Sequence, residues 1–560
     1  MQKQIQKIIG FVIILLCVNS VSAQKKNKTQ NDFNKINENR VEIEINDNSD
    51  HTSIPIDKNG ILVAYKTSQK VGSGLVNINF DLFDTLLNKT STINSMVAKN
   101  YNYLGHTVDK QFCYILYANY NSVNKFMMQD PFLKKYTLFK IDPVNQDVIR
   151  YEGMFPKTFF YKDMNVLNGV VYLGGSIGPS PNDVNKVVCL SMFACFIPLL
   201  FYTPYYEPFV ETIDTRKKLF SKRDIVFDKY KKTTSTIIDL DVNEEQNLCN
   251  LMIKSKTKKE TKLTTVDVKD NRIGNNVNIK LGGNQEVFSG HINSFGNKKL
   301  MAGVYGNKTS LKRGGSPATT GIVVSMYEGN KPVFTSTIPY SKFKNFGIVT
   351  DKVKEVKSGK KTKKITESAS SQNDICFHDF IIRDDEIICI GEVFYPTYHT
   401  ETYTTVDANG RMSTRTVVVF DGYKYMGVVV LALDLKGNLK WENGVRVSNG
   451  PLSFYKDYKY KITEQEDAGI KILYSDGKLI KSATVYSDDA IDYAEDIRVN
   501  EESKSKKKKN NDDDGGFATV DYWYDDYFIA YGHFQAEKDK KSKDKKKNKP
   551  VYYLNKIEIE

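Results

Sequence analysis

Two carboxylates near the middle of the chain have the spacing that acid–base chemistry needs. Asp384 and Asp385 are typical of a turn between two strands, and in that register Asp379 and Glu392 lie diagonally on one face. Two carboxylates on one face can reach the separation used in glycoside hydrolysis, where one donates a proton and the other attacks or activates water. Asp379 and Glu392 are therefore the candidate catalytic residues.

The histidines add no second catalytic motif. In the same register His378 stands opposite Gly391 and on the other face from Glu392, so no His–Glu pair is predicted. The other histidines are scattered singly, and the chain contains no G-x-S-x-G, phosphate loop, dinucleotide fingerprint or HExxH motif. We therefore expect no metal site and no cofactor.

Cysteines are sparse, with 7 in 560 residues. The predicted register sets Cys376 opposite Val393 and Cys389 opposite Phe380, so these two cysteines cannot bond to each other. Disulfides are typical of exported proteins, but so few cysteines indicate that a large apolar core holds the fold.

Tyrosines crowd around a long insertion from Pro396 to Thr416. Tyrosine rings can stack on sugar faces while their hydroxyls reach water or ligand. Tyrosine is also a favoured strand residue, so a structural role stays open. The candidate binding tyrosines are Tyr395, Tyr398, Tyr403, Tyr423 and Tyr425.

Residues 187–203 form an almost wholly apolar segment interrupted by Pro198. The segment is too short and too broken to span a bilayer. It either packs against the body or docks on a partner or membrane interface beside the basic residues that start at Arg216. In the docking interpretation its contact residues are Phe193, Phe196 and Phe201.

The amino-terminal residues predict export. Residues 1–23 have the layout of a cleavable signal peptide, with Lys3 and Lys7, an apolar stretch and a small residue at position 23. Residues 24–53 are polar and predict a disordered tether. We expect a periplasmic, cell-envelope-associated or secreted protein without a transmembrane helix after cleavage.

The net charge of +13 is concentrated in local segments. Basic residues cluster in 216–232 and in three lysine-rich loops at 352–364, 504–514 and 537–549. The three loops contain no aromatic residue on which bases could stack, so nucleic acid is not an expected partner. The loops are solvated, or hold an acidic glycan or an envelope protein by screened attraction.

Hairpins recur along the chain and predict an all-β fold. In the clearest copy, 428–441, Asp434 and Gly437 lie in the turn between two apolar strands. A second recurring pattern, a polar turn, an apolar strand and a glycine, appears at 168–174, 297–303, 384–391 and 525–532. A glycine at a fixed place indicates close backbone approach, as on inner strands around a propeller axis.

We therefore predict a β-propeller-like body over residues 54–560, with six or seven blades of antiparallel strands. Paired β-sandwich domains are the alternative. The alternating run 551–559 is expected to complete a blade with early residues such as 61–65, which removes an exposed edge.

Segments 390–395, 419–423, 433–441 and 523–524 resemble an uncharacterised family of exported bacterial proteins with propeller-like repeats. The resemblance covers most of the chain after residue 23 and implies a compartment and a fold. It supplies no catalytic residues. We expect a non-catalytic binding or scaffold protein that holds a partner protein or glycan on a rim; the alternative is a carbohydrate-active enzyme with acidic residues near the axis.

Overall fold

The short apolar runs separated by polar turns form β-strands in a computed structural model of the protein. The structure describes residues 40–44 and 51–558, apart from gaps at 121–131, 179–205, 228–233, 312–316, 346–351, 368–372, 407–411, 454–457, 499–518 and 536–549 and shorter breaks. Its described helix is the short 3₁₀ turn η2 (Tyr340–Lys342), and no helix among these residues is long and apolar enough to cross a membrane. The all-β prediction is confirmed.

The strands follow the chain in antiparallel order. Those of the first half are β1 (Arg40–Glu44), β2 (His51–Pro55), β3 (Ile61–Lys70), β4 (Leu75–Phe83), β5 (Lys89–Ala98), β6 (Asn102–Val108), β7 (Cys113–Tyr120), β8 (Phe132–Asp142), β9 (Asp147–Leu167), β10 (Val170–Gly178), β11 (Glu207–Asp214), β12 (Lys222–Val226), β13 (Thr234–Asn243), β14 (Leu248–Lys256), β15 (Thr261–Lys269), β16 (Arg272–Ile279), β17 (Gln285–Phe295) and β18 (Lys298–Leu311).

The second half continues the pattern. Its strands are β19 (Pro317–Glu328), β20 (Lys331–Pro339), β21 (Lys352–Ser358), β22 (Lys361–Glu367), β23 (Asp374–Phe377), β24 (Ile381–Ile382), β25 (Glu386–Val406), β26 (Met412–Asp434), β27 (Leu439–Arg446), β28 (Leu452–Ser453), β29 (Tyr460–Glu464), β30 (Ile470–Asp476), β31 (Leu479–Val485), β32 (Ile491–Tyr493), β33 (Ile497–Arg498), β34 (Thr519–Tyr524), β35 (Tyr527–Gln535) and β36 (Pro550–Glu558).

Five of the described sheets are separate blades of four or five strands: β2 to β5, β13 to β16, β17 to β20, β29 to β33, and β1-β36-β35-β34. Two larger sheets, β6 to β12 and β23 to β28, stand between them. In the seven-stranded sheet, β9 pairs mainly with β8 through its first half and with β10 through its second half. We call each set of strands that packs face to face on the next set a layer, and β9 therefore belongs to two layers. The propeller-like prediction is therefore confirmed, but its six or seven blades are corrected to five.

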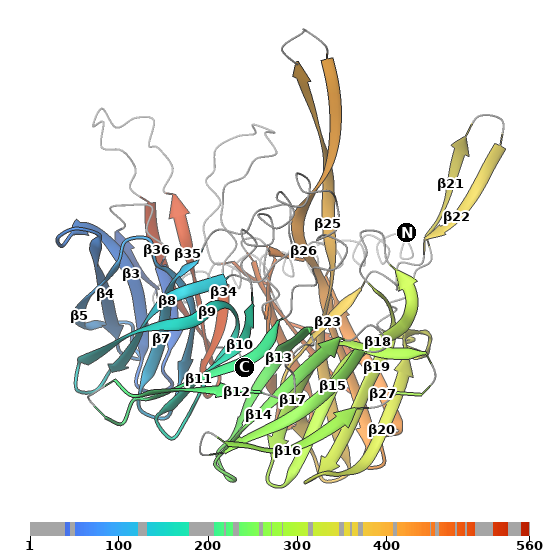
Figure 1. The fold of residues 1–560 in the computed structure, drawn as a ribbon, viewed down its shortest axis with the longest axis horizontal. Coiled ribbons are helices and arrows are strands. Elements are labelled where there is room, and N and C mark those ends of the chain that lie inside the picture. The colour runs from blue at the N-terminus through green and yellow to red at the C-terminus, as the bar shows by residue number, and fades with distance from the viewer. Residues whose placement is uncertain are drawn as a thin grey trace, which may run out of the picture.

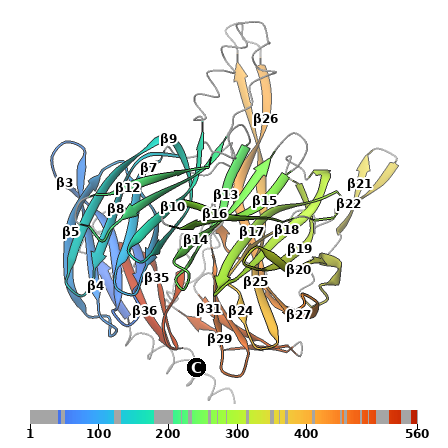
Figure 2. The ribbon, with the colours of Figure 1, turned by 60° about the horizontal axis from the view of Figure 1, so that its bottom comes forward.

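Apolar clusters fill the space between each layer and the next. They join β2–β5 to β7 and β8, then continue through β9–β11, β13–β16, β17–β20, β23–β27 and β29–β31 to β34–β36. A last cluster returns from Trp523 and Leu554 to Ile61 of β3. The sheets thus close into a propeller-like ring, and the two-sandwich alternative does not describe it (Figures 1 and 2).

The ring closes where the amino-terminal strand joins the carboxy-terminal blade. Strand β36 pairs with β35 on one side and with β1 on the other. The predicted partner 61–65 is wrong, because β3 is already bonded to both β2 and β4 and only packs against this blade. Strands β1 and β2 also begin inside 24–53, so the predicted tether does not describe Arg40–Glu44 or the residues from His51 onward.

The recurring glycines lie on the second strands of their layers rather than on the first. A Cβ at Gly391 would lie 2.4 Å from Cγ2 of Ile375, and one at Gly303 would lie 2.7 Å from the carbonyl oxygen of Ser289. The predicted close approach is confirmed at these positions. The neighbour is the adjoining strand of the same sheet, not another blade across the axis.

Replacing Leu554 by alanine should test how far the ring depends on its closure. Leu554 is fully buried between the closing blade and β3, so Leu554→Ala should lower the free energy of unfolding by about 2–5 kcal/mol. Urea denaturation followed by tryptophan fluorescence measures the change. The control Glu558→Ala, on an exposed residue of the same strand, should change it by less than about 0.5 kcal/mol. Equal effects of the two substitutions would contradict the closure argument.

Candidate functional site

The first strands of neighbouring layers contact one another and line the inside of the ring. Direct contacts join β9 to β13, β13 to β17, β17 to β23, and β29 to β34. Strands in this position have no further strand on their inner side, so their polar side chains meet around the axis. The acidic part of this lining consists of Asp163 on β9, Asp239 and Asp241 on β13, and Asp379 after β23, with His291 on β17 among them.

His291 joins two of these carboxylates. Its Nδ1 lies 3.0 Å from Oδ2 of Asp239, and its Nε2 lies 3.0 Å from Oδ1 of Asp379. Burial alone would lower the pKa of His291, but the two carboxylates outweigh burial and raise it to about 10. The imidazolium therefore donates from both ring nitrogens and ties β13, β17 and the segment after β23 together.

Two further carboxyl groups of the lining titrate near neutrality. Burial, reinforced by the charge of Asp239, raises the pKa of Asp163 to about 7. Burial also raises the pKa of Asp241 to about 7; a hydrogen bond from Ser294 opposes the shift, and the charge of Asp379 adds to it. Oδ2 of Asp241 is buried and has no hydrogen-bond partner among the described residues. When Asp241 is protonated, this oxygen can therefore donate a hydrogen bond or a proton to a bound ligand.

Asp379 behaves in the opposite way. The hydrogen bond to His291 holds the pKa of Asp379 below its ordinary value, although burial opposes that shift. Its side chain is 77% exposed, so solvent reaches it. The neighbouring carboxyl groups of Asp241 and Asp379 therefore have pKa values pushed apart, which is the condition for one to act as acid and the other as base.

Glu392, the second predicted catalytic residue, is fully buried and belongs to another network. Its carboxylate accepts hydrogen bonds of 2.9 to 3.0 Å from the backbone N–H groups of Lys459 and Tyr460. One oxygen also lies 2.8 Å from Nε2 of His378. These contacts anchor the start of β29 on β25. Among the described contacts none joins Glu392 to Asp379, so the structure does not bring the predicted pair together.

The contact between His378 and Glu392 also corrects the predicted register. Next to the turn, Ile381 pairs with Ile388 as predicted. Farther along, Cys376 pairs with Glu392, one residue before its predicted partner, because the chain leaves the ladder between β23 and β24. A slip of one residue moves side chains to the other face, which is why His378 reaches Glu392 after all.

A second polar group lies on β6, β29, β34 and β35. The hydroxyl of Tyr103 lies 2.5 Å from Nδ1 of His106, and Asp521 accepts from both Tyr531 and Lys461 at 2.5 Å. Burial within the ring lowers the pKa of His106 to about 4, yet its side chain remains exposed to solvent. This side of the lining thus holds a neutral imidazole and an ion pair.

Sequence reasoning missed Asp163, Asp239, Asp241 and the role of His291. Each lies within a strand where a lone acid or histidine resembles an ordinary solvent-facing residue. The signal that could have found them is their common place: each lies on the strand that begins a structural layer. Identifying the first strand of each layer from the sequence requires knowing where each layer begins. The sequence does not show this for β9, because β9 belongs to two layers.

The candidate tyrosines divide between core and surface. Tyr425 is fully buried against Phe394, and Tyr395 and Tyr423 are half-buried. Tyr398 and Tyr403 are 41% and 46% exposed, on the part of β25 that rises above the ring in Figure 1. Phe193, Phe196 and Phe201, with the whole segment 187–203, lie outside the described residues, as do the loops 504–514 and 537–549.

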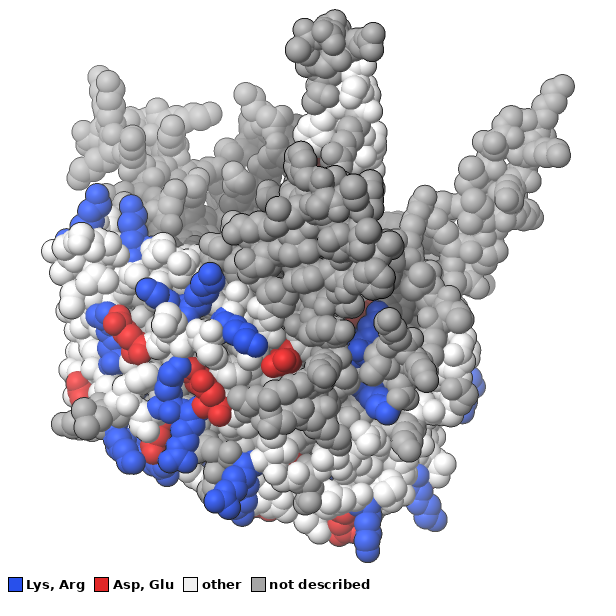
Figure 3. Space-filling view, in the orientation of Figure 1, with Lys and Arg blue, Asp and Glu red and all other residues white. Residues whose placement is uncertain are grey.

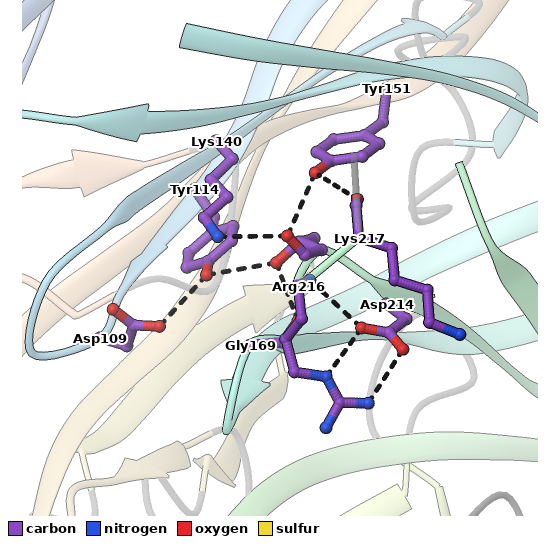
Figure 4. Close-up of polar contacts among 9 residues, drawn as sticks. Asp109, Tyr114, Lys140, Tyr151, Gly169, Asp214, Arg216 and Lys217 are labelled. Atoms are coloured by element: carbon purple, nitrogen blue, oxygen red, sulfur yellow. Dashed lines mark hydrogen bonds and ion pairs between the residues drawn. The ribbon is translucent and has the colours of Figure 1, made fainter. Parts of the chain in front are cut away.

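Basic side chains at the start of 216–232 are neutralised locally. Arg216 donates two hydrogen bonds, of 2.8 and 2.9 Å, to the carboxylate of Asp214 (Figure 4). Lys222 lies 2.7 Å from the buried carboxylate of Glu211. Beside Arg216, the Thr215 carbonyl accepts from Lys140 and from Tyr151, which fixes the β11–β12 turn. Figure 3 shows lysines and arginines interspersed with acids on the viewed face rather than a patch of one sign.

Among the described cysteines, Cys113, Cys249 and Cys389 are free thiols. Cys376 pairs with Glu392 and Cys389 with Leu431, so these two cysteines do not face each other across the strands. Within the described ranges no group of three or more His, Cys, Asp or Glu side chains could hold a metal ion.

No family model and no curated protein matches this chain. Among solved structures, it is similar to a polysaccharide lyase, at 9% identity and a TM-score of 0.37 over 83% of this chain and 93% of the other. It is also similar to Kuenenia stuttgartiensis hydrazine synthase, at 9% identity and a TM-score of 0.32 over 68% and 75%, and to a variant of Synechocystis apocarotenoid oxygenase, at 7% identity and a TM-score of 0.28 over 50% and 61%. These similarities are too low to carry an argument about this chain.

Removing one of the buried carboxyl groups should change the pH dependence of stability. A carboxyl whose pKa is raised in the folded state adds stability below its unfolded value of 3.8, and this is lost as the pH rises through about 7. Asp241→Asn should therefore stabilise the protein by at least about 1 kcal/mol at pH 8, and by much less at pH 4, since an amide carries no charge. Thermal melts at the two pH values measure the difference. A shift that is the same at both pH values would contradict the raised pKa.

Proposed function

We propose that the protein is an exported enzyme that acts on a glycan by acid–base chemistry inside the ring. The observation that supports this proposal is the opposite pKa shifts of Asp241 and Asp379, which lie near enough for the charge of Asp379 to raise the pKa of Asp241, while His291 bonds Asp379 to Asp239. One carboxyl has its pKa raised by burial and the other has its pKa lowered by a hydrogen bond, at the place where three neighbouring layers meet. Pairs of titratable groups separated in this way mark acid and base assignments in enzymes.

In this mechanism Asp241 is the general acid. Near or below pH 7 it carries a proton, which it donates to the oxygen of the leaving sugar. Asp379 is ionised and open to solvent, so it activates a water molecule or attacks the sugar carbon. His291 is a positioning residue, because its two hydrogen bonds hold Asp379 at a fixed distance from β13.

A hydroxyl-rich ligand suits the rest of the lining. Sugar hydroxyls donate to carboxylates and accept from N–H donors, and both kinds of group are present: the acids lie on β9 and β13, and the His106 imidazole and the Lys461 ammonium lie on β6 and β29. The proposal includes export through residues 1–23 to the periplasm, the cell envelope or the medium. A peripheral membrane contact through 187–203 belongs to the same proposal.

The rim-binding scaffold is the second candidate. It is supported by the exposed rings of Tyr398 and Tyr403 on the arm that rises from the ring. In this role the protein holds an envelope protein or an acidic glycan without turning it over. Turnover distinguishes the two candidates, because a scaffold needs neither Asp241 nor Asp379.

The direct test is release of sugar ends from a panel of neutral and acidic polysaccharides by the chain that starts at residue 24. Asp379→Asn and Asp241→Asn should each lower the rate by at least about 100-fold, since each removes a group that moves a proton or attacks. The rate should fall above about pH 7, because Asp241 must be protonated. The control Asp385→Asn, on an exposed carboxylate of the β24–β25 turn, should leave the rate unchanged.

Affinity electrophoresis on the same polysaccharides separates catalysis from binding. An enzyme keeps its affinity in Asp379→Asn while it loses turnover. Binding without turnover in the unmodified protein would replace the enzyme proposal by the scaffold. Neither binding nor turnover on the whole panel would overturn both.

A further inference from the structure

The hairpin of β25 and β26 continues beyond the ring as a two-stranded arm (Figures 1 and 2). Within the ring β25 also pairs with β23, as far as Phe394, and β26 pairs with β27 from Gly427 onward. Beyond the ring, the residues of β26 from Thr414 to Phe420 pair with β25 and with no other described strand. An isolated two-stranded ribbon is marginally stable in water, and its outer edges present backbone groups to a further strand.

The two edges of the arm differ in composition. Thr414–Phe420 on β26 reads Thr-Arg-Thr-Val-Val-Val-Phe, with one charge and no proline or glycine. The residues that face it on β25 include His399 and Glu401. A β-branched, weakly charged stretch at an outer edge is a template for strand addition. The β26 edge is therefore the docking edge of the arm.

We propose that this edge pairs antiparallel with the same edge of a second copy of the chain. The midpoint of Thr414–Phe420 is Val417, so a two-fold axis there sets Val417 opposite the second copy's Val417 and Arg415 opposite its Val419. No like charges meet, and the two arms form one four-stranded ribbon.

The β25 edge does not fit itself in this way. The matching stretch of β25 has its midpoint at Glu401, which pairs with Val417 across the arm. A two-fold axis there would set two Glu401 carboxylates directly opposite each other, which is destabilising. With the axis at the midpoint of each stretch, charge favours the β26 edge for a second copy, and this choice does not depend on the function proposed for the ring.

Cysteine cross-linking tests the predicted axis directly. Opposed residues of antiparallel strands have Cα atoms about 4.5–5.5 Å apart, within the range that a disulfide bridges. Under mild oxidation Val417→Cys should give at least about ten times more covalent dimer than Thr402→Cys, which lies on the other edge of the same arm. The unmodified chain supplies the background from its own thiols. Equal cross-linking of the two variants, or none above background, would overturn the proposal.

Sedimentation velocity over a concentration series tests the association without a covalent bond. Within the arm a lysine at position 417 faces Glu401 and is tolerated, whereas across the axis two lysines repel. Val417→Lys should therefore raise the dimer dissociation constant at least about ten-fold, and Thr402→Lys should change it little. An unmodified protein that stays monomeric at every concentration, or equal weakening by both variants, would overturn the proposal.

Discussion

Each sheet in this ring is apolar on both faces, and a neighbouring sheet must cover each face. Strand β14 illustrates the constraint, because six consecutive residues from Leu248 to Ile253 are buried whichever way they point. A row of such sheets leaves an uncovered face at each end, and a ring leaves none. Pairing β1 with β36 brings the two chain ends into one blade, and Ile61, Trp523 and Leu554 then fill the last junction. Ring closure is thus the condition on which the core depends.

The same geometry explains the chemistry at the centre. First strands meet around the axis with no further strand inside them, so acids from different layers lie close together. Four carboxylates in a partly desolvated space repel one another, and the structure relieves the repulsion in two ways. His291 supplies a cation between Asp239 and Asp379, and Asp163 and Asp241 take up protons near neutrality.

Local features were predictable from the sequence, and features made by distant contacts were not. The turn after β26 was predicted because residues within the turn itself organise it: Oδ1 of Asp434 accepts from the N–H groups of Lys436 and Asn438, and Gly437 takes the positive φ. The partner of β36 was not predicted correctly, because the sequence of β36 has the same alternating pattern whether it pairs with β1 or with β3. Asp379 was predicted because it lies close to the Asp384–Asp385 turn, which the sequence identifies. Asp241 lies far away along the chain, and the packing of β13, β17 and β23 side by side brings the two near each other.

The arm shows how a strand of the ring can leave it without breaking its own ladder. The β25–β26 register shifts twice at the base of the arm, between Val393 and Phe394 and between Thr397 and Tyr398. Gly422, at a φ of 130°, lies close to the carbonyl oxygen of Ser453 on β28. Bulges increase twist and bend a strand, and a glycine permits the conformation that a bend requires. The hairpin therefore turns away from the ring just beyond Glu392, which anchors β29, so ring packing ends where the arm begins.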